Sequence, residues 1–137
     1  ESRGLGDVYK RQALLAAYLQ TAAHRPLSDE ALKIYSTPWL GAVGQPAFYR
    51  QIAQMSTRYT DEVQDLYQPM ECPVTVLWGE NDAWIPAEKG HELAKLISKR
   101  PCILVPGSGH LMQEDRPEAI VAAVLGRAAF LCNSLGH

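Results

Sequence analysis

The stretches that decide the fold are PVTVLWGENDAWIP, residues 73–86, and CILVPGSGHLMQEDRPE, residues 102–118. Each contains a short apolar run, VTVLW (74–78) in the first and CILV (102–105) in the second, without the alternation of a half-exposed strand. Such runs are typical of strands that are buried on both faces of a parallel sheet. We predict two neighbouring strands, each followed by a loop.

Two helices are predicted to alternate with these strands. The first can begin at Pro86, and the second opens in the sequence DRPE, where Asp115 is the expected N-cap and Pro117 lies in the first turn. The apolar stripe of the first helix comprises Leu93, Leu96 and Ile97. The expected core face of the second comprises Ile120, Val121, Val124, Leu125, Ala128 and Leu131. Strand, helix, strand, helix is the order of a parallel sheet with right-handed crossovers, so we predict an α/β fold.

Residues 13–68 differ from this pattern, because helical periodicity there is broken by proline and glycine and no β-alternation occurs. The helices predicted here cover residues 13–23, Ser28 to just before Pro38, and Pro46 to about Tyr59. Ser28 is a good N-cap because Asp29 and Glu30 follow it in the first turn. Residues 1–12 show no sustained period, and we interpret them as a non-native leader, with a native loop as the alternative.

The composition is that of an ordinary globular domain. The chain has 137 residues, of which 47% are hydrophobic and 20% charged, with a formal net charge of −2. Lys and Arg are scattered, so no nucleic-acid footprint is expected. No apolar run approaches the roughly 20 residues that span a bilayer. We therefore expect a cytoplasmic protein that binds neither nucleic acid nor a membrane.

Cysteine and histidine spacing gives no sign of a metal site. The three cysteines are Cys72, Cys102 and Cys132. None of them belongs to a Cys-x-x-Cys pair or stands at metal-ligand spacing from a histidine. Cys72 and Cys102 open the apolar runs, and we expect both to be small buried hydrophobes in a reducing compartment. The histidines that we expect on the surface are His24, His91 and His137. No metal and no cofactor are predicted.

The loops that follow the two predicted strands carry the residues of chemical interest. Asp82 lies in the first loop, and His110 lies in the second, where Gly107 and Gly109 permit a tight turn around Ser108. The carboxyl ends of neighbouring parallel strands open at the same edge of a sheet, which is where ligands bind. A carboxylate there can hold an imidazole in one tautomer, as the acid and the histidine of a catalytic triad do.

At these residues the chain resembles the α/β-hydrolase family. GENDAWIP (79–86) and PGSGH (106–110) are similar to the acid and histidine loops of that family, and DRPEAIVAAVLGRAAFL (115–131) is similar to its closing helix. The resemblance implies the C-terminal part of a doubly wound, mostly parallel sheet. A helical cap or lid segment is then expected over residues 13–68, ahead of the α/β core at residues 69–137.

The resemblance also implies a role for each residue of the pair. Asp82 would be the orienting acid, and His110 the general base that activates a nucleophile or a water molecule. Taken singly, the aspartate is also explained as a turn or N-cap residue and the histidine as a loop residue. Their placement after consecutive strands favours the catalytic interpretation.

The nucleophile that completes such a triad is absent from this sequence. In the family it lies upstream of the cap on a Gly-x-Ser-x-Gly-like elbow, and this chain contains no such elbow. Ser108 belongs to the histidine loop and is expected to hydrogen-bond locally. We therefore expect a fragment that is inactive alone and is preceded by roughly 100 to 150 residues.

The implied activity is hydrolysis of an ester, amide or carbon–carbon bond in a small, largely apolar substrate by a serine nucleophile. The residues expected to line its pocket between cap and sheet are Trp84, Leu111, Trp39 and Phe48, although core packing explains each equally well. One alternative is an aspartate nucleophile, as in haloalkane dehalogenases and epoxide hydrolases. Another is a non-catalytic, truncated hydrolase domain that self-associates through its incomplete sheet.

Overall fold

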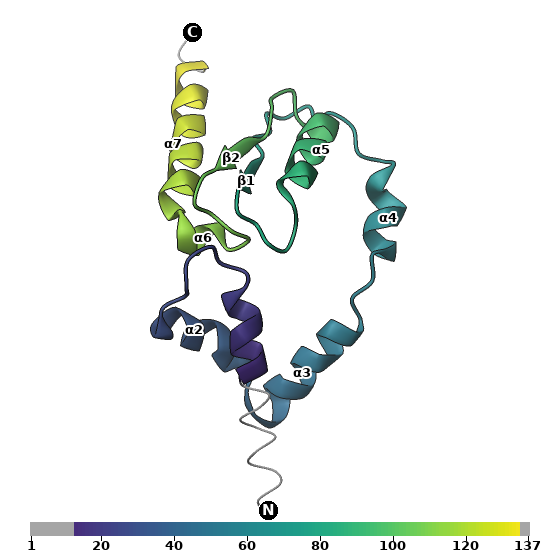
Figure 1. Ribbon diagram of the computed structural model, residues 1–137. Coiled ribbons are helices and arrows are strands. Elements are labelled where there is room, and N and C mark those ends of the chain that lie inside the picture. Colours follow the sequence, from purple (N-terminus) through teal and green to yellow (C-terminus); the bar gives the residue numbers. More distant parts are fainter. Residues whose placement is uncertain (1–12, 135–137) are drawn as a thin grey trace, which may run out of the picture. The chain divides into compact units, whose positions relative to one another are not determined.

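The structure is a computed structural model that describes residues 13–134, with side chains up to residue 126 (Figure 1). The predicted leader at residues 1–12 and the surface histidine His137 lie outside the described residues, as does the side chain of Cys132. Two compact units are present. Residues 13–21 and 26–67 make a helical unit, and residues 22–25 and 68–134 make an α/β unit.

The helical unit contains short helices joined by tight turns. They are residues 13–20, α2 (Asp29–Ser36), the 3-10 helix η1 (Thr37–Trp39), α3 (Gly41–Ala53) and α4 (Arg58–Gln64). The predicted start of α2 is confirmed, because the Ser28 hydroxyl accepts a hydrogen bond of 3.1 Å from the Ala31 backbone N–H.

The predicted bounds of the third helix are wrong at both ends. It begins at Gly41, and Pro46 lies inside it. Gly44 is buried so closely against η1 that a Cβ atom there would lie 2.2 Å from the Pro38 carbonyl oxygen, and this packing overrides the low helix propensity of glycine. The helix ends at Ala53 because the serine and threonine that follow favour a new start, and Ser56 Oγ accepts from the backbone N–H of Arg58 at 3.3 Å.

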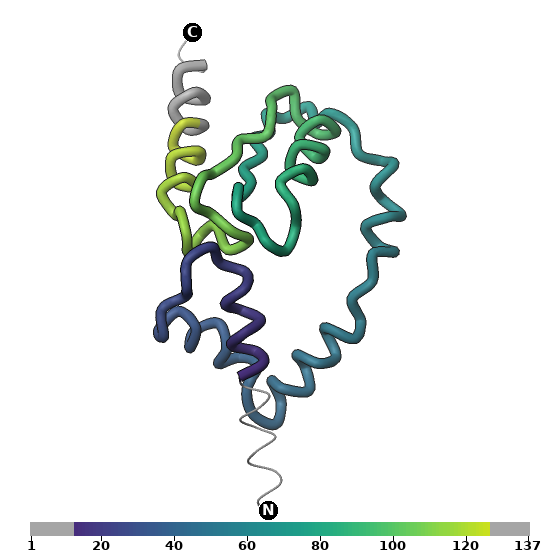
Figure 2. Tube along the Cα trace, in the orientation of Figure 1, coloured from purple at the N-terminus to yellow at the C-terminus, as the bar shows by residue number. Residues whose placement is uncertain are grey.

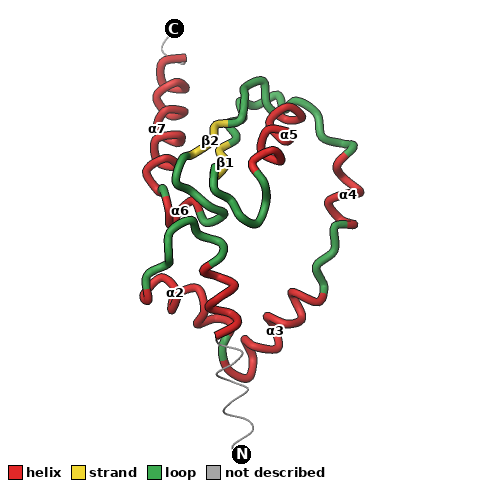
Figure 3. Tube along the Cα trace, viewed as in Figure 1, coloured by secondary structure: helices red, strands yellow, loops and turns green. Residues whose placement is uncertain are grey.

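In the α/β unit two parallel strands pair side by side, β1 (Leu77–Gly79) and β2 (Ile103–Val105), drawn yellow in Figure 3. The first strand begins later than the predicted residues 74–78. The Val74 carbonyl accepts from the Ser98 hydroxyl at 3.1 Å and so leaves the ladder before it starts. At the other end, the Glu80 N–H donates to the Val105 carbonyl at 3.1 Å, which extends the pairing into the loop. The sequence pattern predicted where the strands lie, but the hydrogen-bond partners of their backbone groups decide where they begin and end.

The helices of this unit are α5 (Ala87–Ile97), α6 (Met112–Asp115) and α7 (Pro117–Ser134). The core is made by Val76, Ala94 and Cys102, with Val74, Trp78, Leu93, Ile97 and Leu104 packed against it. Two of the three predicted stripe residues on α5 therefore contribute to the core, whereas Leu96 remains 40% exposed. Cys102 is buried as predicted, and this burial raises the pKa of its thiol. Cys72 is exposed, which corrects the prediction for it.

The predicted core face of α7 is also wrong for three of the four residues whose side chains are described, since only Ile120 is half-buried. Val121, Val124 and Leu125 are between 55% and 62% exposed. The buried core beside the two strands is formed with α5 and not with α7. The apolar face of α7 is therefore left uncovered among residues 13–134.

One close backbone contact joins the end of β1 to the histidine loop. A Cβ atom on Gly79 would lie 2.3 Å from the Gly109 carbonyl oxygen and 2.6 Å from that of Ser108. Both distances are far below van der Waals contact, and both partners are main-chain atoms that cannot rotate away. A hydrogen in place of a side chain at residue 79 is therefore what allows the two loops to lie against each other.

We expect Gly79→Ala to lower the free energy of unfolding by about 3 kcal/mol, because overpacking against main chain forces a backbone shift. Urea denaturation followed by circular dichroism measures this change. Gly126→Ala is the matched control, since a Cβ atom there meets nothing within 4 Å on the helix α7. It should be neutral or stabilising by up to about 1 kcal/mol, and equal effects of both variants would contradict the contact.

Candidate active site

The loops after β1 and β2 are joined by backbone and side-chain hydrogen bonds. The Asn81 N–H donates to the Ser108 carbonyl at 2.9 Å, and the Asn81 side-chain oxygen accepts from the Gly107 N–H at 3.1 Å. Gly107 has φ +67°, a left-handed conformation that glycine adopts without strain. No role for Asn81 is predicted from the sequence, since an asparagine in a polar loop carries no signal of a partner far along the chain.

Asp82 is held in one orientation by its own loop. Its Oδ1 atom accepts from the backbone N–H groups of Trp84 and Ile85, each at 2.9 Å. The side chain is only 5% exposed. Both backbone bonds use the same oxygen, so Oδ2 is left to face another group. Asp82 is thus a turn aspartate, which was the non-catalytic interpretation of this residue. The turn also fixes the direction of its second oxygen, Oδ2.

That second oxygen meets His110. Oδ2 of Asp82 lies 3.0 Å from Nδ1 of His110, whose side chain is 34% exposed. An ionised carboxylate only accepts hydrogen bonds, so Nδ1 carries the proton and donates it. The lone pair of the neutral imidazole is then on Nε2, on the opposite edge of the ring, where it can accept a proton from another molecule.

The four predicted substrate-binding residues divide into two pairs. The Trp84 ring stacks at a tilt on the His110 imidazole with 5.0 Å between centroids, and Leu111 follows His110 directly. Trp39 and Phe48 lie in the helical unit, where their ring centroids are 5.7 Å apart and where both line a cavity of about 310 Å³ with Leu15 and Ile52. The first pair is therefore next to His110, and the second belongs to an apolar cavity.

Ser108 is fully buried, and its hydroxyl bonds locally to the Gly109 carbonyl at 3.4 Å. This agrees with the expectation that it is a residue of the histidine loop. A hydroxyl with no exposed surface is not in a position to attack a substrate.

Asp115 does not have its predicted role. It is the last residue of α6 and is 5% exposed, and it does not cap α7. Its Oδ2 atom accepts from the backbone N–H groups of His24 and Gly109, each at 2.8 Å, and its Oδ1 atom accepts from that of Arg25 at 2.9 Å. Asp115 thus binds the main chain beside His110, and its N-cap spacing in the sequence concealed this.

The pKa of Asp115 reflects two opposing influences. Burial raises the pKa of this carboxyl, and the N–H donors of His24, Arg25 and Gly109 lower it by stabilising the charged form. The donors outweigh burial, so the pKa lies below its ordinary value.

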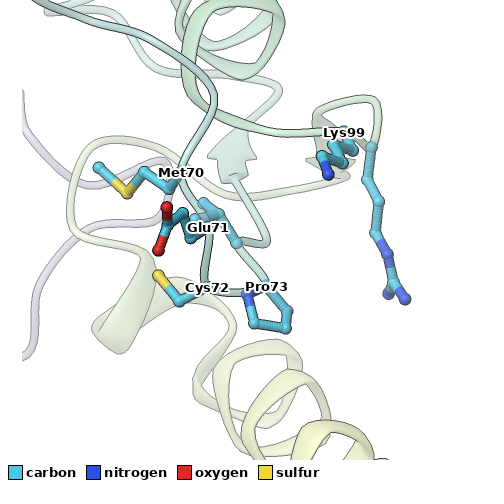
Figure 4. Close-up of a pocket in the computed structure, with 7 residues that line it drawn as sticks. Met70, Glu71, Cys72, Pro73 and Lys99 are labelled. Atoms are coloured by element: carbon cyan, nitrogen blue, oxygen red, sulfur yellow. The ribbon is translucent and has the colours of Figure 1, made fainter.

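A separate cavity of about 230 Å³ lies at the opposite ends of the strands (Figure 4). Met70, Glu71, Cys72 and Pro73 line it from the segment before β1, and Lys99 lines it from the segment before β2. Ligands of parallel sheets bind beyond the carboxyl ends of strands, and this cavity is at the amino ends. The candidate active site is therefore at Asp82 and His110.

Residues 13–134 contain no described group of three or more His, Cys, Asp or Glu side chains that could hold a metal ion. Within the same residues, every helix is too short or too polar to cross a membrane.

Comparisons with known proteins agree on the fold. A model of the alpha/beta hydrolase family matches residues 3–123. A crystal structure of an alpha/beta hydrolase fold protein from Burkholderia ambifaria is 53% identical with a TM-score of 0.84, over 87% of this chain and 44% of that one. The uncharacterized hydrolase YugF of Bacillus subtilis (strain 168) is 25% identical over 115 residues, 80% of this chain and 40% of that protein. This chain thus spans less than half the length of either relative, and the predicted α/β-hydrolase fold class is confirmed.

Because the folded-state pKa of Asp115 lies below the unfolded value of about 3.9, its carboxylate should stabilise the fold above that pH. The contribution is expected to disappear as the pH falls through the folded-state pKa. Asp115→Asn should lower the free energy of unfolding by about 3 kcal/mol at pH 7, since charged hydrogen bonds are lost, and by less at pH 3. Urea denaturation at both pH values measures the difference. Glu88→Gln, an exposed acid on α5, is the control, and the same pH dependence in both variants would contradict the assignment.

Proposed function

We propose that Asp82 and His110 are the acid and the histidine of a hydrolytic triad, because this chain belongs to the alpha/beta hydrolase family and carries this pair at the carboxyl ends of two parallel strands. The 3.0 Å contact between Asp82 Oδ2 and His110 Nδ1 is the observation that supports this most directly. In the proposed reaction, Nε2 of His110 accepts a proton from a nucleophile or a water molecule. The Asp82 carboxylate then stabilises the imidazolium ion. Two backbone N–H groups already hold this carboxylate in place.

The nucleophile of the proposed triad lies outside this chain. Supporting this are the lack of an elbow sequence and the coverage of the two relatives, since the matches extend over only 44% and 40% of their lengths. A serine nucleophile would give hydrolysis of an ester, an amide or a carbon–carbon bond. In that case His110 would remove the hydroxyl proton during attack and return it to the leaving group.

The proposed substrate is small and largely apolar. Trp84 lies against the imidazole at 5.0 Å, so an apolar group bound near His110 would contact its indole. The cavity that Trp39 and Phe48 line in the helical unit, which we propose to be the cap, is of a size that suits a small apolar group. We also propose the cytoplasm as the compartment, since Cys72 and Cys102 are both free thiols.

The second candidate is an aspartate nucleophile, as in haloalkane dehalogenases and epoxide hydrolases. Here the carboxylate attacks carbon without a base, and His110 acts only afterwards, when it activates the water that hydrolyses the ester intermediate. The Asp82–His110 pair serves both mechanisms equally. The residue on the upstream elbow distinguishes them, and the presence of neither serine nor aspartate there would rule out both.

In the protein with its upstream sequence, we expect His110→Ala to reduce kcat by three or more orders of magnitude, because the proton acceptor is lost. A panel of p-nitrophenyl esters, haloalkanes and epoxides measures this. His91→Ala is the matched control, since His91 is an exposed histidine on α5. Retention of more than a tenth of the activity in His110→Ala would remove it from the triad.

The same variant separates the two nucleophiles. With an aspartate nucleophile, His110→Ala still forms the ester intermediate but cannot hydrolyse it, so a covalent adduct accumulates after incubation with substrate. With a serine nucleophile, attack itself needs the base, and no adduct builds up. Intact-protein mass spectrometry at one-minute intervals detects the adduct, and the unsubstituted enzyme run in parallel supplies the baseline.

A non-catalytic alternative is association between copies of this chain, which the exposed apolar face of α7 favours. Val121, Val124 and Leu125 are exposed on one helix, and contiguous apolar surface of this kind promotes association. In this alternative the chain has lost the nucleophile and acts as a binding or self-associating domain.

We expect the 137-residue chain to sediment as oligomers at micromolar concentration. Replacing Val121, Val124 and Leu125 together with serine should raise the monomer fraction several-fold, because the apolar area that drives association is removed. Sedimentation velocity measures the distribution. Leu66→Ser, which removes an apolar side chain that is 72% exposed in the helical unit, is the control. A monomeric unsubstituted chain would contradict the proposal.

A further inference from the structure

We propose that Asp115 is a positioning residue for His110, acting through the main chain on either side of the histidine. The inference rests on the proposed role of His110 and concerns a residue that is not a member of the proposed triad. Asp115 touches neither the imidazole nor Asp82 in any contact described above, so its effect must pass through the backbone.

The backbone N–H groups of the residues before and after His110 are both hydrogen-bonded. The Gly109 N–H donates to Oδ2 of Asp115 at 2.8 Å, and the Leu111 N–H donates to the Ala22 carbonyl at 3.0 Å. His110 lies between these two fixed points, and its side chain must reach Asp82 from there. A displacement of either point would move the imidazole.

Asp115 also fixes the second of these points. Its carboxylate accepts from the backbone N–H groups of His24 and Arg25, which belong to the same short segment as Ala22. Figure 2 shows this segment, coloured purple, beside the yellow-green segment that carries Asp115. Hydrogen bonds and short stretches of chain thus form a closed circuit. Asp115 binds Gly109, Leu111 binds Ala22, and His24 binds Asp115, while the chain itself joins residues 109–111 and residues 22–24.

The main chain around Gly109 is also closely packed. A Cβ atom on Gly109 would lie 2.7 Å from the His24 nitrogen and 2.9 Å from the Ala22 carbonyl oxygen. Gly109 is thus in close backbone contact with residues 22–24 and, through its carbonyl oxygen, with Gly79. The histidine loop therefore has main chain on two sides, at Gly79 and at residues 22–24. Asp115 connects the loop to the second of these segments, because it accepts hydrogen bonds from both.

The three donors use both oxygens of the Asp115 carboxylate. Oδ2 accepts two N–H groups and Oδ1 accepts one, which uses both oxygens. An asparagine at residue 115 has the same shape but one acceptor oxygen. Its NH₂ group would face at least one N–H donor, leaving that donor without a partner and repelling it.

The consequence is a requirement on the geometry at His110. The Asp82–His110 contact is 3.0 Å, so a small displacement of the loop removes it. When Asp82 no longer accepts from Nδ1, the neutral imidazole is free to place its proton on Nε2 instead. Nε2–H cannot act as a base. Loss of Asp115 should therefore change the tautomer of His110 at a distance.

The test is ¹⁵N NMR of the histidine side chains in the 137-residue chain at pH 8, where imidazole is largely neutral. In the unsubstituted chain we expect His110 to be the Nδ1–H tautomer. In Asp115→Asn we expect the Nδ1–H signal to be lost and the Nε2–H form to appear, with amide exchange at Gly109 at least tenfold faster. Glu88→Gln, which removes one exposed negative charge, should match the unsubstituted chain in both measurements.

Each outcome decides the proposal. An Asp115→Asn chain that keeps the Nδ1–H tautomer would overturn it, as would a Glu88→Gln chain that loses it. Where Asp115→Asn lowers the folded fraction, trimethylamine N-oxide shifts the equilibrium to the compact state, and the tautomer is measured there. A variant that stays unfolded in that osmolyte would also overturn the proposal, because Asp115 would then serve global stability.

The tautomer measurement needs no turnover, which separates this inference from the triad itself. A tautomer change without any His110-dependent hydrolysis in the longer protein would refute the triad and leave the positioning role. The reverse pattern would refute the positioning role and leave the triad.

Discussion

The structure of the α/β unit depends on main chain meeting main chain at Gly79 and Gly109. Parallel pairing of β1 with β2 brings two loops to the same edge, but pairing alone leaves room for side chains between them. At Gly79 that room is absent, since the Ser108 and Gly109 carbonyls occupy the place of a Cβ atom. The loop that carries Asp82 and the loop that carries His110 therefore lie in direct backbone contact, and Asp82 and His110 come within 3.0 Å of each other.

The start of α2 and the existence of two paired strands were predicted correctly because their signals are local. Ser28 caps α2 through an N–H three residues away, and Asp82 and His110 follow apolar runs that mark the strands, so short windows of sequence contain the evidence. The strand ends were misplaced because they depend on partners elsewhere, such as the Ser98 hydroxyl on Val74. The face of α7 was assigned to the core on its pattern, and a helical pattern does not say whether anything covers it.

Asp115 shows why local reasoning failed at one residue of the site. The sequence DRPE has the spacing of a helix start, and an aspartate there explains itself without distant partners. Its actual donors include His24 and Arg25, about ninety residues earlier. No periodicity or motif connects positions so far apart, and only burial at 5% exposure marks the carboxylate as unusual. A buried carboxylate requires hydrogen-bond donors, and one of the donors to Asp115 is the Gly109 N–H in the histidine loop.

Asp82 and Asp115 have the same side chain but different environments, because their two carboxylate oxygens accept hydrogen bonds from different sets of donors. Asp82 accepts both of its backbone N–H groups on Oδ1, which leaves Oδ2 for an imidazole. Asp115 spends both oxygens on the main chain and has none directed at a titrating side chain. The first arrangement is suited to stabilising a charge that appears on a histidine, and the second to holding backbone still. In this protein the role of a carboxylate therefore follows from which oxygen the main chain leaves unused.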